Sequence, residues 1–243
     1  MLSCAAKAPP REIIVAAASS LTDVLTSLQA EAERTTGVHI LFHFAGSGII
    51  RKQIEQGFPA DVFFSAASTD MDELEKAGFL ESDTKLNLLS NSIVLIGGND
   101  QAAISSFLEL SSLLASTSLV AIGNPASVPA GRYAVQALTS LGLYSMVEKK
   151  LVLGGNARQV LQYVQSGSVP LGIVFATDVG SVASGGVVKQ LFGFSDKTLD
   201  FPVHYQVAVM VTSGYKHESE RLVEFFHGDI ARAAFFKAGF GTL

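Results

Sequence analysis

Four predicted helix starts in this chain carry small, neutral residues and almost no charge. They read Ala18-Ser19-Ser20-Leu21, Ala45-Gly46-Ser47-Gly48, Val128-Pro129-Ala130-Gly131 and Gly155-Asn156-Ala157, and three of them directly follow an apolar, strand-like run. The first N–H groups of a helix have no partner within the helix, and the peptide dipoles add positive potential there. Several such ends that converge on one point would bind an anion without any lysine or arginine. The sequence therefore predicts anion capture rather than acid–base chemistry.

Helix capping offers a second explanation for the polar residues in these turns. Ser20, Ser47 and Asn156 all belong to residue types that are favoured at the N-cap. Ser20 with Asp23 three residues later resembles a capping box, and Asn156 stands in the same relation to Gln159. Capping and ligand binding are therefore both open for these residues at this point.

Ser47 lies between two glycines, and this raises the alternative of a serine hydrolase. The nucleophile elbow of such enzymes has glycine two residues before and two residues after the serine, whereas here these positions hold Ala45 and Ile49. The five histidines do not have the spacing of a metal site, and the chain has no phosphate-binding loop motif. Catalysis by Ser47 stays as the alternative from the enzyme class.

The composition limits the kinds of partner. The chain has 243 residues with 48% hydrophobic content, which suits one large domain or two modest ones. Its net charge of −5 comes from 17 basic and 22 acidic residues without a basic run, which argues against nucleic acid or an anionic membrane surface as a partner. No apolar stretch reaches the roughly 18 to 20 residues that a membrane-spanning helix needs.

The only cysteine is Cys4, so the sequence predicts neither an internal disulfide nor a thiolate zinc cluster. Met1-Leu2-Ser3-Cys4 resembles the end of a lipoprotein signal, in which the cysteine becomes lipidated, and residues 5–10 would then form a short tether. An incidental cysteine is the alternative, because the charged and apolar regions of a signal are absent.

Apolar runs and amphipathic segments alternate along the chain, which is typical of strands that alternate with helices. In the first part we expect strands at residues 13–17, 38–44 and 61–64, each followed by a helix. Such alternation predicts parallel sheets with right-handed crossovers, and these sheets bind ligands at the carboxyl ends of their strands.

The rest of the chain predicts a second lobe and a return to the first. Two apolar runs within residues 86–97 fit a strand that leaves one lobe and enters the next, and a long strand at 203–211 fits the return. Further expected elements are strands at 119–122, 151–153, 171–175 and 187–192, helices that begin at Pro129 and near Asn156, and two final helices at 216–227 and 229–238. We therefore expect a tether at residues 1–10, one lobe formed by 11–88 together with 203–243, and a second lobe formed by 89–202.

Several longer motifs, spread over nearly the whole chain from Ile13, carry a more specific signal. They read Ala16-Ala17-Ala18-Ser19-Ser20-Leu21-Thr22, Phe44-Ala45-Gly46-Ser47-Gly48, Gln53-Ile54-Glu55-Gln56-Gly57-Phe58-Pro59-Ala60-Asp61-Val62-Phe63, Gly123-Asn124-Pro125 with Val128-Pro129-Ala130-Gly131, and Leu171-Gly172-Ile173-Val174. Together they resemble the molybdate-binding proteins of bacterial ABC importers, and they occur in that family's order. The resemblance, added to the shared position of the polar residues at strand-to-helix turns, favours one ligand site over unrelated helix caps.

The resemblance implies the type II periplasmic-binding-protein fold: two α/β lobes with parallel-type sheets, joined by crossing strands, with the ligand cleft between them. The family's ligand positions fall on Ser20, Ser47, Ala130 and Ala157. The serines would donate from side chain and backbone and the alanines from the backbone alone, all to the oxygens of molybdate rather than to the metal. A fifth position, commonly a tyrosine that donates its hydroxyl, falls on Phe175.

The phenylalanine at this fifth position is a departure from the family. Thr177, Tyr133 or a water molecule would replace the missing donor, or the site would make one hydrogen bond fewer.

The implied function is the capture of molybdate or tungstate, without a cofactor, and its delivery to the permease of an ABC importer. We expect a monomer in the periplasm or otherwise outside the cytoplasm, anchored to the membrane if Cys4 is lipidated. A sulfate-type oxyanion-binding protein is the alternative within this class. An effector-sensing domain of a transcription regulator would share the fold, but it would normally adjoin a DNA-binding helix-turn-helix, which we do not expect in residues 1–10.

Overall fold

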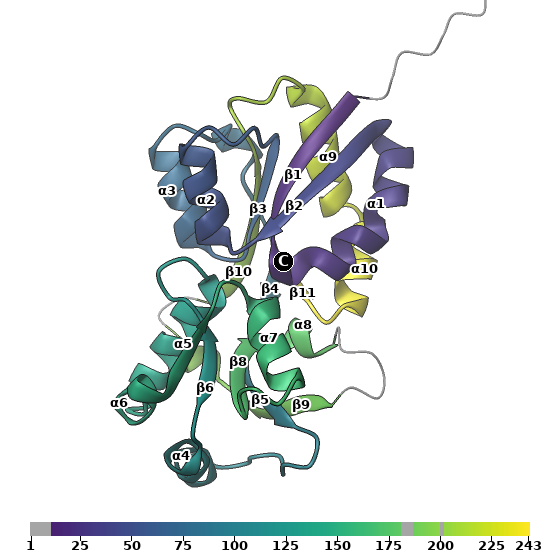
Figure 1. Cartoon of the computed structure of the whole chain (residues 1–243). Coiled ribbons are helices and arrows are strands. Elements are labelled where there is room, and N and C mark those ends of the chain that lie inside the picture. The colour runs from purple at the N-terminus through teal and green to yellow at the C-terminus, as the bar shows by residue number, and fades with distance from the viewer. Residues whose placement is uncertain (1–10, 181–186, 200–201) are drawn as a thin grey trace, which may run out of the picture.

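The computed structural model describes residues 11–180, 187–199 and 202–243. They form two α/β lobes that lie one above the other, each built around its own sheet (Figure 1). In this part of the chain, no helix is long and apolar enough to cross a membrane. Cys4 and the expected tether at residues 1–10 lie outside the described residues.

The upper lobe in Figure 1 contains a six-stranded sheet in the order β11-β4-β10-β3-β1-β2. Its strands are β1 (Arg11–Ala18), β2 (Val38–Ala45), β3 (Val62–Ser65), β4 (Leu86–Asn91), β10 (Val203–Val209) and β11 (Gly241–Thr242). Its helices are α1 (Thr22–Thr36), α2 (Ser47–Glu55), α3 (Ser68–Lys76), α9 (Lys216–His227) and α10 (Asp229–Lys237).

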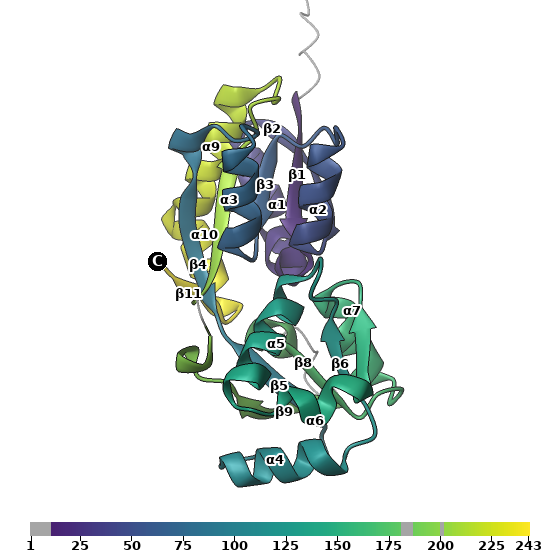
Figure 2. The same ribbon diagram turned by 90° about the vertical axis from the view of Figure 1, so that its left-hand side faces the viewer.

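Helices cover both faces of this sheet, because successive strand residues point to opposite sides. Phe63 on β3 packs in a cluster with Ile50 of α2 and Met71 of α3. The next residue, Phe64, belongs to the opposite core and meets Phe226 of α9 at a ring distance of 5.9 Å. Figure 2 shows the same layering from the side.

The lower lobe contains a five-stranded sheet in the order β7-β6-β8-β5-β9. Its strands are β5 (Ile93–Gly98), β6 (Val120–Gly123), β7 (Leu151–Gly154), β8 (Leu171–Phe175) and β9 (Val188–Gly193). Its helices are α4 (Phe107–Ser116), α5 (Pro129–Ser140), α6 (Tyr144–Val147), α7 (Ala157–Gln165) and α8 (Ala176–Gly180). Short 3-10 turns lie at Ser19–Leu21, Ser82–Thr84, Glu148–Lys150 and Asp196–Thr198.

Both sheets are mixed rather than wholly parallel. β1 pairs in parallel with β2 and β3, and β6 does so with β7 and β8. β10 is antiparallel to β3 and β4, and β5 is antiparallel to β8 and β9. The antiparallel pairs involve the strands that precede or follow a connection between the lobes. A strand–helix–strand crossover within one lobe makes its two strands parallel, whereas a strand that comes from the other lobe can run in either direction.

The chain leaves the upper sheet at Asn91, the last residue of β4, and enters the lower sheet at Ile93. It returns between β9 and β10. We expected the boundary between the lobes at residues 88 and 89, which are in the middle of β4, whereas the chain passes to the lower sheet after Asn91.

Candidate anion-binding site

A small cavity lies where the two lobes meet. Its volume is about 10 Å³, which is room for about one water-sized sphere. The upper lobe contributes Ala18, Ser19, Ser20, Ala45, Gly46, Ser47 and Ala66 to its lining, and the lower lobe contributes Val128, Pro129, Ala157 and Phe175. The cavity therefore lies at the carboxyl ends of β1, β2, β3 and β8 and at the first turns of α2, α5 and α7.

Four of the five predicted ligand positions line this cavity: Ser20, Ser47, Ala157 and Phe175. Ala130 is fully buried at the second position of α5, and its neighbour Pro129 forms part of the lining although Ala130 does not. The fold thus brings Ser20, near the start of the described chain, together with Phe175 in the lower lobe.

Ser47 begins α2 and is fully buried. Its hydroxyl oxygen accepts a hydrogen bond from the backbone N–H of Ala66 at 3.0 Å and makes no capping bond to its own helix. Because a hydroxyl group has one proton to donate, that proton is left to point away from the Ala66 N–H.

Ser20 does not cap α1, so the expected capping box with Asp23 is wrong. A 3-10 turn at Ser19–Leu21 separates β1 from α1, and Leu21 takes the N-cap position without a side-chain bond. The turn directs Ser20 inward, where its hydroxyl group lies 2.8 Å from the hydroxyl of Tyr205.

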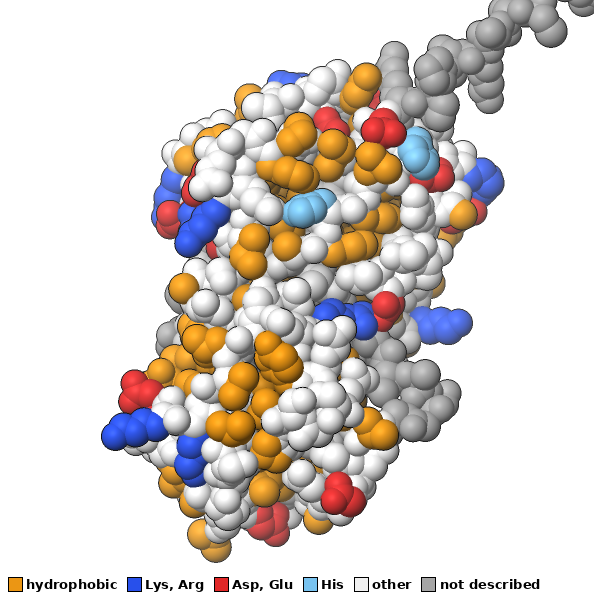
Figure 3. All heavy atoms as spheres, viewed as in Figure 1, with side chains coloured by type: hydrophobic (Ala, Val, Ile, Leu, Met, Phe, Trp, Pro, Cys, Tyr) orange, Lys and Arg blue, Asp and Glu red, His pale blue; other side chains and the backbone are white. Residues whose placement is uncertain are grey.

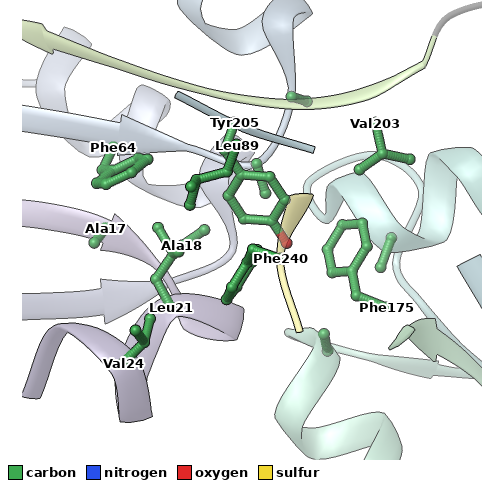
Figure 4. Close-up of a cluster of buried hydrophobic side chains, with 14 of the residues drawn as sticks. Ala17, Ala18, Leu21, Val24, Phe64, Leu89, Phe175, Val203, Tyr205 and Phe240 are labelled. Atoms are coloured by element: carbon green, nitrogen blue, oxygen red, sulfur yellow. The ribbon is translucent and has the colours of Figure 1, made fainter. Parts of the chain in front are cut away.

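Tyr205 was not expected at the site, because nothing in a long apolar strand marks one tyrosine as a partner of a serine 185 residues away. It lies fully buried on β10, and its ring is beside Phe175 and Phe240 (Figure 4). Burial raises the pKa of Tyr205 well above its ordinary value, so the phenol keeps its proton.

Asn156 caps α7 as expected. Its side-chain oxygen accepts from the N–H of Gln159 at 2.9 Å, and the Gln159 side chain accepts from the N–H of Gly155 at 2.6 Å. The cap uses the asparagine side chain, so α7 offers the cavity its backbone and Ala157 rather than an asparagine side chain.

Phe175 is the last residue of β8 and lines the cavity. The ring centre lies 5.7 Å from that of Tyr205 and 6.4 Å from that of Tyr133.

Thr177, one of the expected replacement donors, accepts a hydrogen bond from Asn91 at 2.8 Å. Burial raises the pKa of Tyr133 to about 12. Thr177 and Tyr133 are not among the described residues that line the cavity.

Arginines near the cavity are engaged by carboxylates. Arg132 on α5 pairs with Asp70 on α3, and Arg158 on α7 pairs with Asp23 on α1, so each pair joins the two lobes. Asp70 also accepts from Arg51 at 3.3 Å within the upper lobe. The described residues that line the cavity therefore offer helix ends and hydroxyl groups to an anion, and none of them is Lys or Arg.

Asp178 lies fully buried close to the cavity, and its carboxylate accepts from the N–H of Phe175 at 3.2 Å. Burial raises the pKa of Asp178 to about 7, while the Arg158 guanidinium, 3.8 Å away, opposes this shift. Below that pH the carboxyl group is largely protonated, so it adds little negative charge beside the cavity. Within the described residues, no group of three or more His, Cys, Asp or Glu could hold a metal ion.

Residues 13–241 match the family of bacterial extracellular solute-binding proteins. The chain belongs to this family. It is 32% identical to the molybdate-binding protein ModA of Escherichia coli over 94% of this chain and 88% of that protein. It is 33% identical to YvgL of Bacillus subtilis, named as an ABC transporter substrate-binding lipoprotein, over 94% of this chain and 85% of that protein.

The fold is also that of a solved relative. The periplasmic molybdate-binding protein of Azotobacter vinelandii superposes with a TM-score of 0.83 at 22% identity, and the match covers 94% of this chain and 98% of that structure. This confirms the two-lobed fold expected from the sequence. Solute-binding proteins of this family bind rather than convert their ligands, so the chain is a binding protein and not an enzyme that uses Ser47.

Proposed function

We propose that this chain binds molybdate, or its close analogue tungstate, between its lobes and delivers it to the permease of an ABC importer. The observation that carries the proposal is the convergence of helix ends and two serine hydroxyls on one interlobe cavity whose neighbouring arginines are already paired. The relatives that are named as molybdate-binding proteins support the same ligand. No cofactor is needed, because capture involves no chemical step.

The proposed contacts are hydrogen bonds from Ser20 and Ser47 in the upper lobe and from the backbone N–H groups of Ala130 and Ala157 in the lower lobe. Phe175 would close one side of the cavity with its ring. Such a site consists of donors, so a phosphate that keeps one proton would bury an O–H group without an acceptor, at a cost of about 1 to 3 kcal/mol. Molybdate, tungstate and sulfate carry no such proton, and the size of the cavity would separate sulfate from the larger two.

A tetrahedral oxyanion has five heavy atoms, and the cavity has room for about one water-sized sphere. The lobes would therefore move apart to admit the ligand and close on it, with the passage from β4 to β5 as a hinge between them. The closed, loaded monomer would be the form that the permease recognises. If Cys4 is lipidated, it would hold the protein at the outer face of the membrane.

Isothermal titration with molybdate, tungstate, sulfate and phosphate tests this function. We expect tight binding of the first two, much weaker binding of sulfate and no measurable binding of phosphate. Ser47→Asp should abolish molybdate binding in a folded protein, because a negative charge suits the first turn of a helix but repels a dianion. Sulfate binding tighter than molybdate binding would favour the sulfate-type alternative, and molybdate binding retained by folded Ser47→Asp would remove Ser47 from the site.

A further inference from the structure

Side chains on the two strands that leave and re-enter the upper sheet form a hydrogen-bonded chain that ends at Ser20. Asn91 is the last residue of β4, and Tyr205 lies on β10, which pairs with β4. The Asn91 side-chain nitrogen lies 3.1 Å from the Tyr205 hydroxyl, and that hydroxyl lies 2.8 Å from the Ser20 hydroxyl.

The direction of these hydrogen bonds follows from the backbone. The side-chain oxygen of Asn91 accepts from the N–H of Ser92 at 2.8 Å, and this fixes which end of the amide faces Tyr205. An amide nitrogen only donates, so the Tyr205 oxygen accepts from Asn91. The second proton of that nitrogen goes to Thr177 at 2.8 Å.

The single proton of Tyr205 then has the Ser20 oxygen as its acceptor, because its other close polar neighbour, the Asn91 nitrogen, is itself a donor. Ser20 therefore accepts from Tyr205, and its own proton must point elsewhere. Ser20 lines the small interlobe cavity and also a neighbouring pocket of about 420 Å³, so its proton can point toward an anion bound in the cavity. The Ser47 hydroxyl oxygen likewise accepts a hydrogen bond, from the N–H of Ala66, so its proton also points elsewhere.

We propose that Asn91 and Tyr205 are positioning residues that hold the Ser20 hydroxyl as a donor toward the bound anion, and that they thereby make the site select fully deprotonated oxyanions. This inference rests on the proposed function, since it concerns the same cavity. Without the proton of Tyr205, Ser20 could turn its lone pairs to the cavity and accept from a protonated ligand.

A double-mutant cycle tests whether Tyr205 acts through Ser20. Tyr205→Phe removes the hydroxyl and keeps the ring beside Phe175 and Phe240. We expect it to weaken molybdate binding about tenfold in the native background and by no more than about twofold in a Ser20→Ala background. An equal loss in both backgrounds would show that Tyr205 supports the fold in general and would overturn the inference.

Selectivity is the second readout, because a merely structural defect would weaken all anions alike. Because direct titration should show no phosphate binding to the native protein, phosphate affinity is measured by displacement of bound molybdate at high phosphate concentration. Tyr205→Phe should lower the ratio of molybdate affinity to phosphate affinity at pH 7, and an unchanged ratio would contradict the proposal. Tyr163→Phe is the matched control, since Tyr163 lies on α7 and is not among the described residues that line the cavity. It should leave both the affinity and the ratio unchanged.

If Tyr205→Phe proves unstable in thermal unfolding, Asn91→Asp provides an independent test. The new carboxylate only accepts hydrogen bonds, so the Tyr205 hydroxyl would donate its proton to that carboxylate and no longer to the Ser20 hydroxyl. Its charge also repels the anion, but that repulsion persists in a Ser20→Ala background. We expect a larger loss of molybdate affinity with Ser20 present than without it, and equal losses would refute the inference. Failure of the native protein to bind molybdate would instead refute the proposed function.

Discussion

At the scale of single residues, Phe175 decides how many donors the cavity offers. The family resemblance implies a tyrosine hydroxyl at this position, and the ring found here has none. The rings of Tyr205 and Tyr133 pack against it, and Phe175 is buried. The nearby Tyr205 hydroxyl bonds to Ser20 and Asn91 rather than standing in for the missing group.

We therefore expect Phe175→Tyr to tighten molybdate binding several-fold. The new hydroxyl would add one hydrogen bond to a charged acceptor, worth about 1.5 to 3 kcal/mol before the cost of desolvation. The gain should come mainly from slower release, which stopped-flow dissociation can measure. An unchanged release rate would mean that another group already serves as the fifth donor.

Residue types and spacing predicted the helix starts and the Asn156 cap, because helix geometry and local hydrogen bonding favour them there. The hydrogen bond of Ser47 is not local, since its hydroxyl accepts from the N–H of Ala66. The hydrogen bond between Ser20 and Tyr205 could not be predicted from the residues next to Ser20 in the sequence. Its partner Tyr205 lies 185 residues away on a strand whose alignment with β1 depends on the whole sheet. Contacts of this kind follow from tertiary packing, and a single sequence does not contain them in any local pattern.

At the scale of elements, the backbone at the start of α2 makes direct contact with the lower lobe. The N–H of Gly48 donates to the carbonyl oxygen of Ser127 in the lower lobe at 3.0 Å. A Cβ atom on Gly48 would lie 2.8 Å from that oxygen, closer than real Cβ atoms come to a backbone atom. Gly48 therefore allows the first turn of α2 to meet the lower lobe.

Gly48→Ala should hold the lobes apart and weaken molybdate binding at least about tenfold. Alanine favours a helix over glycine by about 1 kcal/mol, so the unliganded protein should unfold at the same temperature or higher. Calorimetric titration and thermal unfolding separate the two effects. Gly57→Ala, just after the end of α2, does not serve as a control. The backbone of Gly57 has φ +93, so an alanine there would be strained and would destabilise the upper lobe itself. Native affinity in Gly48→Ala would show that closure tolerates a wider gap.

Most strands and helices could be predicted because the period of the apolar residues changes from two to 3.6 along the chain. The strand at 38–44 and the final helix pair match β2, α9 and α10 closely. The strand order could not be predicted in the same way. β10 pairs with β3 and β4, which lie more than 100 residues earlier, and its antiparallel direction follows from the path of the chain between the lobes.

At the scale of the whole molecule, ion pairs join the lobes beside the cavity. Figure 3 shows basic and acidic side chains next to each other where the two lobes meet. The Arg158 and Asp23 side chains are 25% and 58% exposed, so solvent weakens this pair. Asp70 is only 4% exposed, so its pair with Arg132 is the less screened one.

The Arg132–Asp70 pair should therefore contribute more to closure than the Arg158–Asp23 pair. Arg132→Gln removes the bond between the lobes, while Asp70 keeps Arg51 as a partner within the upper lobe. The upper lobe should then stay folded, and any loss of affinity reports on closure alone. Asp23→Asn is the matched change in the exposed pair.

We expect Arg132→Gln to lower molybdate affinity by about three- to tenfold, and Asp23→Asn by less than about twofold, which is the scale of exposed ion pairs. Small-angle scattering should show a larger radius of gyration for unliganded Arg132→Gln than for the native protein, because fewer contacts hold the lobes together. Because Asp70 is nearly buried, added salt should change the ratio of native affinity to Arg132→Gln affinity only slightly. Equal losses in the two variants would mean that the buried environment of Asp70 does not strengthen its interlobe bond, and that the helix ends at the cavity close the molecule without it.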